Sequence, residues 1–220
     1  MNRKERLIRF KGIDIYPVTC QELSQGRSNL DVLNAVLAGG ARIIQLREKH
    51  WGKKELYESA IEFRERTIKH DALLIINDHV DVALAAGADG VHLGQEDLPI
   101  KVAREIAPDL IVGASSHSLG EALRAEQDGA DYVNIGPIFP TKTKNGASRS
   151  LGPDAIREIR PRLKAPFTTM GGINHENILL VLEAGARRVA MVTGITRAPD
   201  IEKRVRELRE IILSYQSSPD

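Results

Sequence analysis

The sequence predicts a single (β/α)8 barrel, and two observations support that prediction. Short β-like apolar runs alternate eight times with longer amphipathic stretches along the 220 residues. A Gly-Ala pair followed by Arg or Asp also recurs between a predicted helix and the next predicted strand, at Gly40, Gly87, Gly129 and Gly185. Glycine there supplies the left-handed conformation that ends a helix. Such an alternation over this length is typical of a closed ring of parallel strands.

A doubly wound open sheet is the main alternative for this α/β pattern. That fold normally carries a glycine-rich phosphate loop directly after its first strand. The first predicted strand here ends in Val18-Thr19-Cys20-Gln21, which contains no glycine. We therefore favour the barrel.

The individual elements follow from the hydrophobic pattern. The predicted strands span residues 15–20, 43–49, 73–78, 91–94, 110–115, 132–139, 166–170 and 189–195. The predicted helices span residues 30–37, 54–69, 80–86, 100–107, 119–127, 154–163, 176–183 and 201–215. Residues 1–13 are interpreted as a short extension or an extra helix, and residues 214–220 as a frayed tail. No linker or low-complexity segment divides the chain, so residues 1–220 are expected to form one domain.

Composition excludes several classes of partner. The formal net charge of +1 gives no overall field that would favour nucleic acid or an acidic membrane surface. No apolar run is long enough to span a membrane, and the basic N-terminus lacks the apolar core of a signal peptide. One cysteine, Cys20, excludes an intramolecular disulfide and fits a reducing compartment. We expect a cytoplasmic protein, with the oligomeric state open and a homodimer among the options.

Two acids follow consecutive predicted strands, and the rest of the chain is organised around them. Asn77-Asp78 closes the third strand and Asp97 comes just after the fourth. A parallel βαβ unit brings the C-terminal ends of both strands to one side of the sheet. Each acid alone is explained equally well by a helix cap or a turn. The pair favours a Mg²⁺ site, since Mg²⁺ commonly takes one or two carboxylates and completes its shell with water and substrate phosphates.

The second predicted strand ends in Gln45-Leu46-Arg47-Glu48-Lys49. Residues two apart share a face of a strand, so Gln45, Arg47 and Lys49 point the same way. Two cations on an inner face are costly without an anionic partner. A diphosphate would satisfy them, because Arg can bind phosphate oxygens with two parallel hydrogen bonds. Salt bridges to acids on a neighbouring strand are the alternative.

The later strands end in small and polar residues. Ser115 closes the fifth strand, where it could hydrogen-bond a ligand. After the sixth strand, a long loop carries Thr141, Lys142, Thr143 and Lys144, which could form a lid over phosphate or only a solvated basic surface. His92 and His117 are interpreted as structural histidines and not as general bases.

The last two strands predict a phosphate pocket. Gly171-Gly172 follows the seventh strand, and Val192-Thr193 ends the eighth. Glycines after strand seven and backbone amides after strand eight form the usual phosphate-monoester pocket of this barrel class.

Taken in order, these segments resemble the thiamine-phosphate synthase family over nearly the whole chain, from about Ile15 to Tyr215. The Gln-Glu-Asp and Thr-Lys-Thr-Lys segments are the most specific. The motifs are Gln45-Leu46-Arg47-Glu48-Lys49, Asn77-Asp78, Val91-His92-Leu93-Gly94-Gln95-Glu96-Asp97, Gly136-Pro137-Ile138-Phe139-Pro140-Thr141-Lys142-Thr143-Lys144 and Gly171-Gly172-Ile173. Met170 and Thr193 depart from the residues common in the family, but both keep their backbone amides.

The resemblance implies a TIM barrel and a transferase reaction. The family joins 4-amino-2-methyl-5-hydroxymethylpyrimidine diphosphate to 4-methyl-5-(2-phosphoethyl)thiazole, giving thiamine phosphate and diphosphate. The C–O bond to diphosphate breaks before the thiazole nitrogen attacks. Such a step needs the growing charge of the leaving group to be neutralised, and it needs no protein nucleophile.

The family's site residues carry over by position. The residues implied to hold the pyrimidine diphosphate are Gln45, Leu46, Arg47, Glu48, Lys49, Asn77, Ser115 and Lys144. The residues implied to hold the thiazole phosphate are Thr141, Lys142, Thr143, Gly171, Gly172, Val192 and Thr193. Asp78 and Asp97 would bind Mg²⁺, and the groups implied in catalysis are Arg47, Lys49, Ser115 and Lys144.

Three other functions remain open at this point. A thiazole tautomerase of the same fold would need no diphosphate site, and the set Arg47, Lys49, Asp78, Asp97 and Lys144 argues against it. A phosphosugar isomerase or epimerase would share the glycine pocket but should show a pair of bases at the rim. A barrel that only binds thiamine precursors as a regulator would bind both substrates without turnover.

Overall fold

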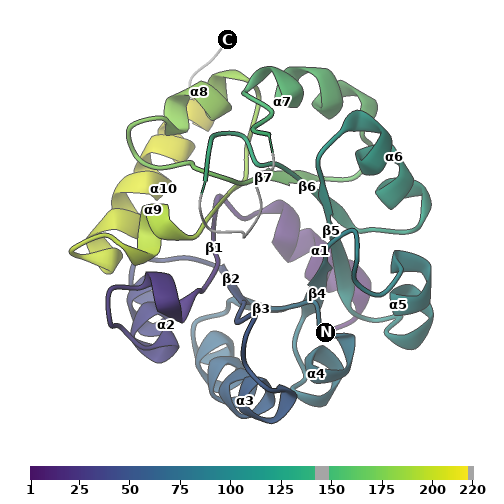
Figure 1. Cartoon of the computed structure of the whole chain (residues 1–220). Helices are drawn as coiled ribbons and strands as arrows, with labels where there is room; N and C mark the ends of the chain where they lie inside the picture. Colours follow the sequence, from purple (N-terminus) through teal and green to yellow (C-terminus); the bar gives the residue numbers. More distant parts are fainter. Residues whose placement is uncertain (142–148, 218–220) are drawn as a thin grey trace.

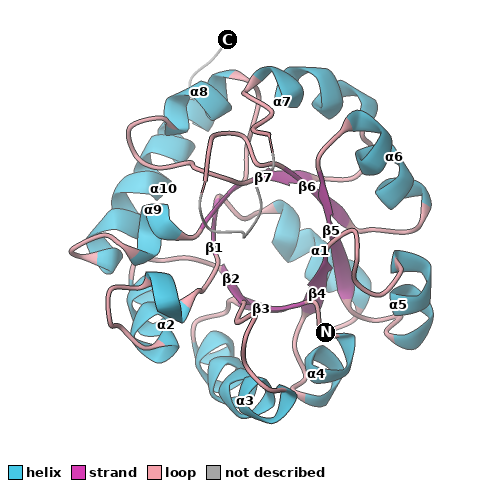
Figure 2. Cartoon of the chain, viewed as in Figure 1, coloured by secondary structure: helices cyan, strands magenta, loops and turns pink. Residues whose placement is uncertain are grey.

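The computed structural model describes residues 1–141 and 149–217. Within them, eight parallel strands are paired in the order β1-β8-β7-β6-β5-β4-β3-β2. A bridge between Val18 and Gln45 joins the first strand to the second, and the Thr19 N–H donates to the Gln45 carbonyl oxygen at 2.9 Å. The ring is therefore closed, and the helices that follow the strands surround it (Figure 2). The predicted (β/α)8 barrel is confirmed.

The strands and helices alternate along the chain. The strands are β1 (Ile15–Pro17), β2 (Ile43–Leu46), β3 (Leu73–Asn77), β4 (Gly90–Leu93), β5 (Ile111–Ser116), β6 (Tyr132–Ile135), β7 (Phe167–Thr169) and β8 (Val189–Met191). The helices are α1 (Arg3–Lys11), α2 (Asn29–Ala38), α3 (Lys53–Lys69), α4 (Val80–Ala85), α5 (Ile100–Ile106), α6 (Leu119–Gln127), α7 (Asp154–Ile159), α8 (Ile178–Glu183), α9 (Thr193–Thr196) and α10 (Ile201–Ser217). Two 3₁₀ turns, η1 (Gln21–Leu23) and η2 (Arg160–Arg162), complete them.

Several predicted boundaries were wrong, chiefly at the C-terminal ends of strands. The run 189–195 ends as a strand at Met191, and the chain then turns into α9. The run 132–139 ends at Ile135, because the segment beyond it leaves the sheet for the barrel mouth. The predicted helix 154–163 ends early and continues as η2, where Pro161 cannot donate a helical hydrogen bond. The tail prediction was wrong for residues 214–217, which belong to α10, while residues 218–220 lie outside the described part.

Inward and outward residues alternate along each strand and build two apolar layers. Ile44 and Leu46 point outward into the large core between the strands and the helices. Ile43, Leu73 and Tyr132 point inward and fill one end of the barrel. This alternation explains why polar residues of the same strands reach the barrel interior.

The four Gly-Ala joints end their helices as predicted. Gly40, Gly87, Gly129 and Gly185 all have positive φ, between 61° and 102°. In each joint the following alanine N–H donates to a carbonyl five residues earlier, for example Ala88 to Ala83 at 2.9 Å. The chain thereby re-enters the barrel at a fixed register.

Residues 3–11 of the N-terminal segment form helix α1, which resolves the choice between an extension and an extra helix. A capping box begins it: the Glu5 N–H donates to Asn2 Oδ1 at 3.0 Å, and the Asn2 N–H donates to Glu5 Oε2 at 2.9 Å. Figure 1 shows α1 lying across one open end of the strand ring. Among the described helices, none is both long and apolar enough to cross a membrane.

Candidate functional site

A cavity lies at the C-terminal ends of the strands and holds about 950 Å³ of space, part of it open to solvent. The structure brings most of the predicted site residues to it. The predicted residues in its lining are Gln45, Arg47, Lys49, Asn77, Asp78, Asp97, Ser115, Thr141, Gly171, Gly172, Val192 and Thr193.

Two predicted contacts do not line the cavity. Leu46 is fully buried in the outer core, because it is one residue out of phase with the inward-facing Gln45 and Arg47. Glu48 is buried beside the loop after β1, where its carboxylate accepts the Gln21 N–H at 3.0 Å. Burial raises the Glu48 pKa. Lys142, Thr143 and Lys144 lie outside the described residues.

Arg47 and Lys49 have different surroundings. The Lys49 ammonium forms an ion pair with Asp78, so the salt-bridge alternative holds for this lysine. Arg47 is 9% exposed, and its guanidinium makes no ion pair with any residue in 1–141 or 149–217. Its backbone N–H donates to Thr19 Oγ1 at 2.9 Å. The neighbouring Glu48 carboxylate interacts with Arg47 electrostatically, but a buried guanidinium that forms no ion pair favours an anionic ligand.

Asp78 and Asp97 meet at the rim, as their positions after β3 and β4 predicted. Asp78 adopts a left-handed backbone, with φ of 63°, which the short polar Asp side chain tolerates better than most. Burial raises the Asp78 pKa, and hydrogen bonding with Asp97 raises it further. Burial works against ionisation of Asp97 as well, but hydrogen bonds from Asp78 and from the Gly94 N–H lower its pKa overall. The Gly94 hydrogen bond is 2.6 Å long.

These two carboxylates fit a hard cation. Their oxygens are the donors that Mg²⁺ prefers, and Mg²⁺ needs only one or two carboxylates when substrate phosphates supply other ligands. No cluster of three or more His, Cys, Asp or Glu residues suited to a metal occurs in the described residues. The donor set therefore fits a metal shared with a phosphorylated substrate and not one enclosed by protein alone.

Ser115 and Gln45 are held from below by hydrogen bonds inside the barrel. The Ser115 hydroxyl lies 2.9 Å from His92 Nε2, and Gln45 Nε2 donates to the Tyr16 hydroxyl at 2.9 Å. The Gln95 side-chain amide donates to the Ser115 carbonyl at 2.6 Å and fixes the end of β5. His92 is thus hydrogen-bonded in the interior, in line with its interpretation as a structural histidine.

The turn after β7 packs tightly against the loop after β6. The Ile138 N–H donates to the Met170 carbonyl and the Phe139 N–H to the Gly171 carbonyl, both at 2.9 Å. A side chain at Gly172 would come within 2.6 Å of the Pro140 carbonyl oxygen, and φ there is 64°. Glycine is therefore required for this turn to stay close to the loop while its backbone faces the cavity.

The cavity also includes residues that the sequence reasoning did not assign. Asn134 lies on the inner face of β6, and its Oδ1 accepts the Thr168 hydroxyl at 2.8 Å. Its position two residues after the inward-facing Tyr132 was the available signal. His117 lines the rim, where its Nδ1 lies 2.9 Å from Glu121.

Comparison with known proteins agrees with this geometry. A family model described as thiamine monophosphate synthase matches residues 15–195. A thiamine-phosphate synthase of Caldicellulosiruptor saccharolyticus is 42% identical over 219 residues, covering 99% of each chain. One from Pyrococcus abyssi is 46% identical over 200 residues, covering 91% of this chain and 95% of its own.

Solved structures agree as well. The thiamine phosphate pyrophosphorylase of Pyrococcus furiosus superposes with a TM-score of 0.87 at 41% identity, covering 94% of this chain and 98% of its own. A 3-hexulose-6-phosphate synthase, with a TM-score of 0.66 at 19% identity, shares the fold alone. With a family model covering most of its length and near full-length relatives above 40% identity, the chain belongs to the thiamine-phosphate synthase family of transferases.

Proposed function

We propose that the barrel mouth couples 4-amino-2-methyl-5-hydroxymethylpyrimidine diphosphate to 4-methyl-5-(2-phosphoethyl)thiazole, giving thiamine phosphate and diphosphate. The observation that carries this proposal is the buried guanidinium of Arg47. It has no carboxylate partner among the described residues and faces the same cavity as Asp78, Asp97 and the Gly171-Gly172 turn. Basic side chains, a pair of carboxylates and a glycine turn suited to phosphate line one cavity, and such a combination fits two phosphorylated substrates.

The pyrimidine diphosphate is assigned to the side of the cavity formed by β2 to β5. Gln45 and Asn77 present amides, and Ser115 presents a hydroxyl, for the pyrimidine ring and its substituents. Arg47 and Lys49 receive the diphosphate. Lys144 is added to this group on sequence grounds. Leu46 and Glu48 are left out, and Glu48 is assigned the role of holding the loop after β1.

The thiazole phosphate is assigned to the side formed by the loops after β6, β7 and β8. Gly171 and Gly172 bring backbone close to the ligand, and the chain at Val192 and Thr193 begins α9, where the first N–H groups of a helix lack partners within it. Thr141 lies at the same opening. Lys142 and Thr143 join this set on sequence grounds.

Asp78 and Asp97 would hold Mg²⁺ between the two sides. When bound, Mg²⁺ supplies positive charge to the oxygens of the leaving diphosphate. Asp78 also pairs with Lys49, so a cation held there would compete with the Lys49 ammonium for this carboxylate and leave the lysine available to phosphate.

The chain's own contribution to the reaction is charge and position. As the C–O bond breaks, negative charge grows on the diphosphate, and Arg47 and Lys49 lie where they can stabilise it. The two assigned subsites hold the thiazole nitrogen beside the reacting carbon, which removes much of the entropic cost of a bimolecular step. No protein nucleophile is needed. We also propose that residues 1–220 work as one domain, supported by the contacts between α1 and the barrel.

A coupling assay tests the proposed function. The purified chain is mixed with both substrates and Mg²⁺, and thiamine phosphate and diphosphate are measured together. Equal amounts of both products, abolished when Mg²⁺ is chelated or the thiazole is omitted, are expected. A tautomerase would release no diphosphate, and a regulator would bind the substrates without releasing any product, so either result would overturn the proposal.

A further inference from the structure

Helix α1 closes the end of the barrel opposite the cavity, outside the segment matched by the family model, which begins at residue 15. Its last turn carries Phe10, which is completely buried. The ring stacks on Tyr132 with 4.2 Å between centroids and 28° between planes, and it meets Tyr16 edge-on at 6.4 Å. Phe10 therefore forms the floor on which the two tyrosines of the barrel interior rest.

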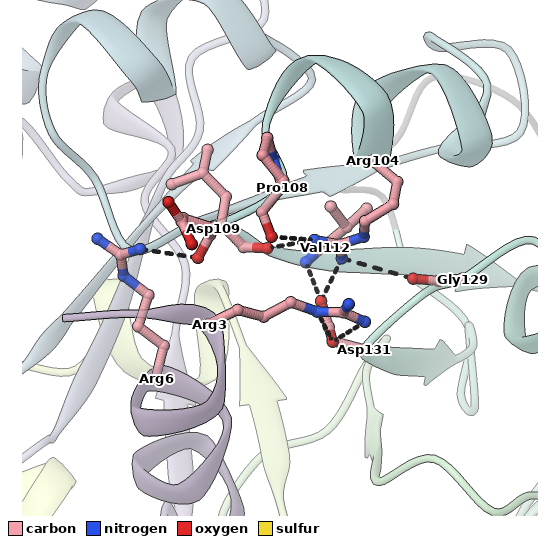
Figure 3. Close-up of polar contacts among 9 residues, drawn as sticks. Arg3, Arg6, Arg104, Pro108, Asp109, Val112, Gly129 and Asp131 are labelled. Carbon is pink, nitrogen blue, oxygen red and sulfur yellow. Dashed lines mark hydrogen bonds and ion pairs between the residues drawn. The ribbon is translucent and has the colours of Figure 1, made fainter.

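Hydrogen bonds and ion pairs hold the helix against that end of the barrel. Arg3 donates to Asp131 at 2.8 Å, and Arg6 donates to the Asp109 carbonyl at 2.7 Å (Figure 3). Arg6 also pairs with Asp89 at 3.2 Å. At the other end of α1, Arg188 donates to the carbonyl of Phe10 at 3.3 Å. These contacts fix the position of the Phe10 ring under the barrel.

From the tyrosines, hydrogen bonds lead up to the mouth. The Tyr16 and Tyr132 hydroxyls lie 3.0 Å apart, and the Tyr132 hydroxyl lies 3.0 Å from His92 Nδ1. His92 Nε2 then reaches Ser115 at 2.9 Å. On the other branch, Gln45 donates to the Tyr16 hydroxyl at 2.9 Å. Both branches end at residues that line the cavity.

One order of donors and acceptors gives each hydroxyl hydrogen within this chain of contacts an acceptor. The Gln45 amide nitrogen can only donate, so the Tyr16 oxygen accepts from it. The Tyr132 oxygen is then the acceptor within reach of the Tyr16 hydrogen, and this order is adopted, although either hydroxyl could donate. The Tyr132 hydrogen then goes to His92 Nδ1, which leaves the proton of His92 on Nε2, donated to the Ser115 oxygen. The Ser115 hydrogen is thereby left to point into the cavity. Burial raises the pKa of both tyrosines, in keeping with their roles as O–H donors.

We propose that Phe10 and Tyr132 are positioning residues for the transferase reaction. Phe10 holds the Tyr132 ring in place, and Tyr132 sets the tautomer of His92. His92 in turn orients the Ser115 hydroxyl as a donor to the pyrimidine substrate. This inference rests on the proposed function, because it needs Ser115 and Gln45 on the pyrimidine side. It gives α1 a part in activity from the far end of the barrel.

Kinetics of Tyr132→Phe and Phe10→Leu test the proposal. Tyr132→Phe keeps the stacked ring and removes only the hydroxyl, so the fold should survive. Each variant is expected to lower kcat/KM for the pyrimidine diphosphate by roughly tenfold, the scale of one lost hydrogen bond. The KM for the thiazole phosphate should not change. A double variant that falls little below Tyr132→Phe alone would show that both residues act through one chain of contacts.

Leu7→Ala serves as the matched control, because Leu7 also lies on α1 and packs against the same inner cluster without any ring stack. It should lower Tm and leave kcat/KM unchanged. Histidine ¹⁵N NMR supplies a second readout: the Nε2–H tautomer of His92 is expected in the wild type and should be lost in Tyr132→Phe.

Three results would overturn the inference while leaving the proposed function intact. These are wild-type kinetics in Tyr132→Phe, a raised KM for the thiazole phosphate, or an unchanged His92 tautomer in an active enzyme. If the wild type itself shows no coupling activity, the proposed function fails first.

Discussion

The two ends of this barrel handle buried charge in opposite ways. At the end covered by α1, Asp89 is completely buried and accepts from two arginines, Arg6 and Arg64, and from the Leu74 N–H. Asp131 likewise forms ion pairs with two arginines, Arg3 and Arg104, and accepts a hydrogen bond from the Val112 N–H (Figure 3). At the mouth, Arg47 has no ion-pair partner among the described residues, and two carboxylates lie side by side.

The difference separates stability from function. A buried charge with a full set of partners stabilises one structure, and removing a partner leaves the others uncompensated. A buried charge that lacks a partner costs stability and is retained where a ligand completes it. Charges at the closed end should therefore affect unfolding, and charges at the mouth should affect turnover.

The largest effect is expected at the closed end, from Asp89→Ala. Arg6 and Arg64 would lose their counter-charge and Leu74 its hydrogen-bond acceptor, so the free energy of unfolding should fall by about 3–5 kcal/mol. Urea unfolding measures this. The surface pair Lys53–Asp81 offers a control: Asp81→Ala should change stability by about 0.5 kcal/mol or less. Equal losses in both variants would contradict the contrast between the ends.

At the mouth, Asp78→Ala and Asp97→Ala should each lower turnover by on the order of a hundredfold or more, through lost charge stabilisation. Asp78→Ala should also lower Tm, because Ala tolerates the left-handed backbone at φ of 63° less well than Asp and the ion pair with Lys49 is lost, so rates are compared at a temperature at which each variant is folded. Steady-state rates across a Mg²⁺ series measure the effect. Near-normal rates at limiting Mg²⁺ would remove the metal assignment.

A smaller effect is expected from Arg47→Gln. It should lower kcat/KM for the pyrimidine diphosphate by roughly tenfold to a hundredfold and leave Tm unchanged or higher, because no ion pair is broken. Arg209→Gln is the control at the closed end, where Arg209 pairs with the buried Asp14 at 3.0 Å. That change should lower Tm and leave kcat/KM intact. The reverse pattern would show that Arg47 is structural.

The smallest effect is expected from Arg3→Gln. The Arg3 side chain is 43% exposed, and Asp131 keeps its contact with Arg104. The loss in unfolding free energy should be about 0.2–1 kcal/mol, measured by urea unfolding beside Asp89→Ala. If Arg3→Gln lowered the unfolding free energy as much as Asp89→Ala does, solvent exposure of the arginine would not weaken its ion pair with the buried aspartate.

Sequence reasoning located the mouth better than the closed end. Asp78 and Asp97 were paired correctly because the ends of consecutive parallel strands must converge, whatever the details of packing. Leu46 and Glu48 were assigned through their neighbours in a motif, although strand alternation turns Leu46 away from the cavity. The site assignments themselves stay predictions, including Lys142, Thr143 and Lys144, which fall outside the described residues.

The sequence contains fewer features that predict the structure of the barrel end covered by α1. Asn2 and Glu5 form a recognisable start for a helix, and that capping box could have identified α1. The position of α1 on the barrel could not be deduced from the sequence. Its partners Asp89 and Asp131 lie many residues away, and each looks like an ordinary residue of a Gly-Ala-Asp segment between a helix and a strand. The same limit applies to the contact between Phe10 and Tyr132.

The sequence by itself determined the order of elements, the closed-barrel class, the family and the rim on which the polar residues gather, because these depend on local periodicity and strand direction. Only the tertiary structure decided which charges have partners, that Arg47 stands without one among the described residues while Lys49 pairs with Asp78, and that α1 supports Tyr132 from beneath. Those facts depend on distances between segments far apart in the chain, which no local pattern encodes.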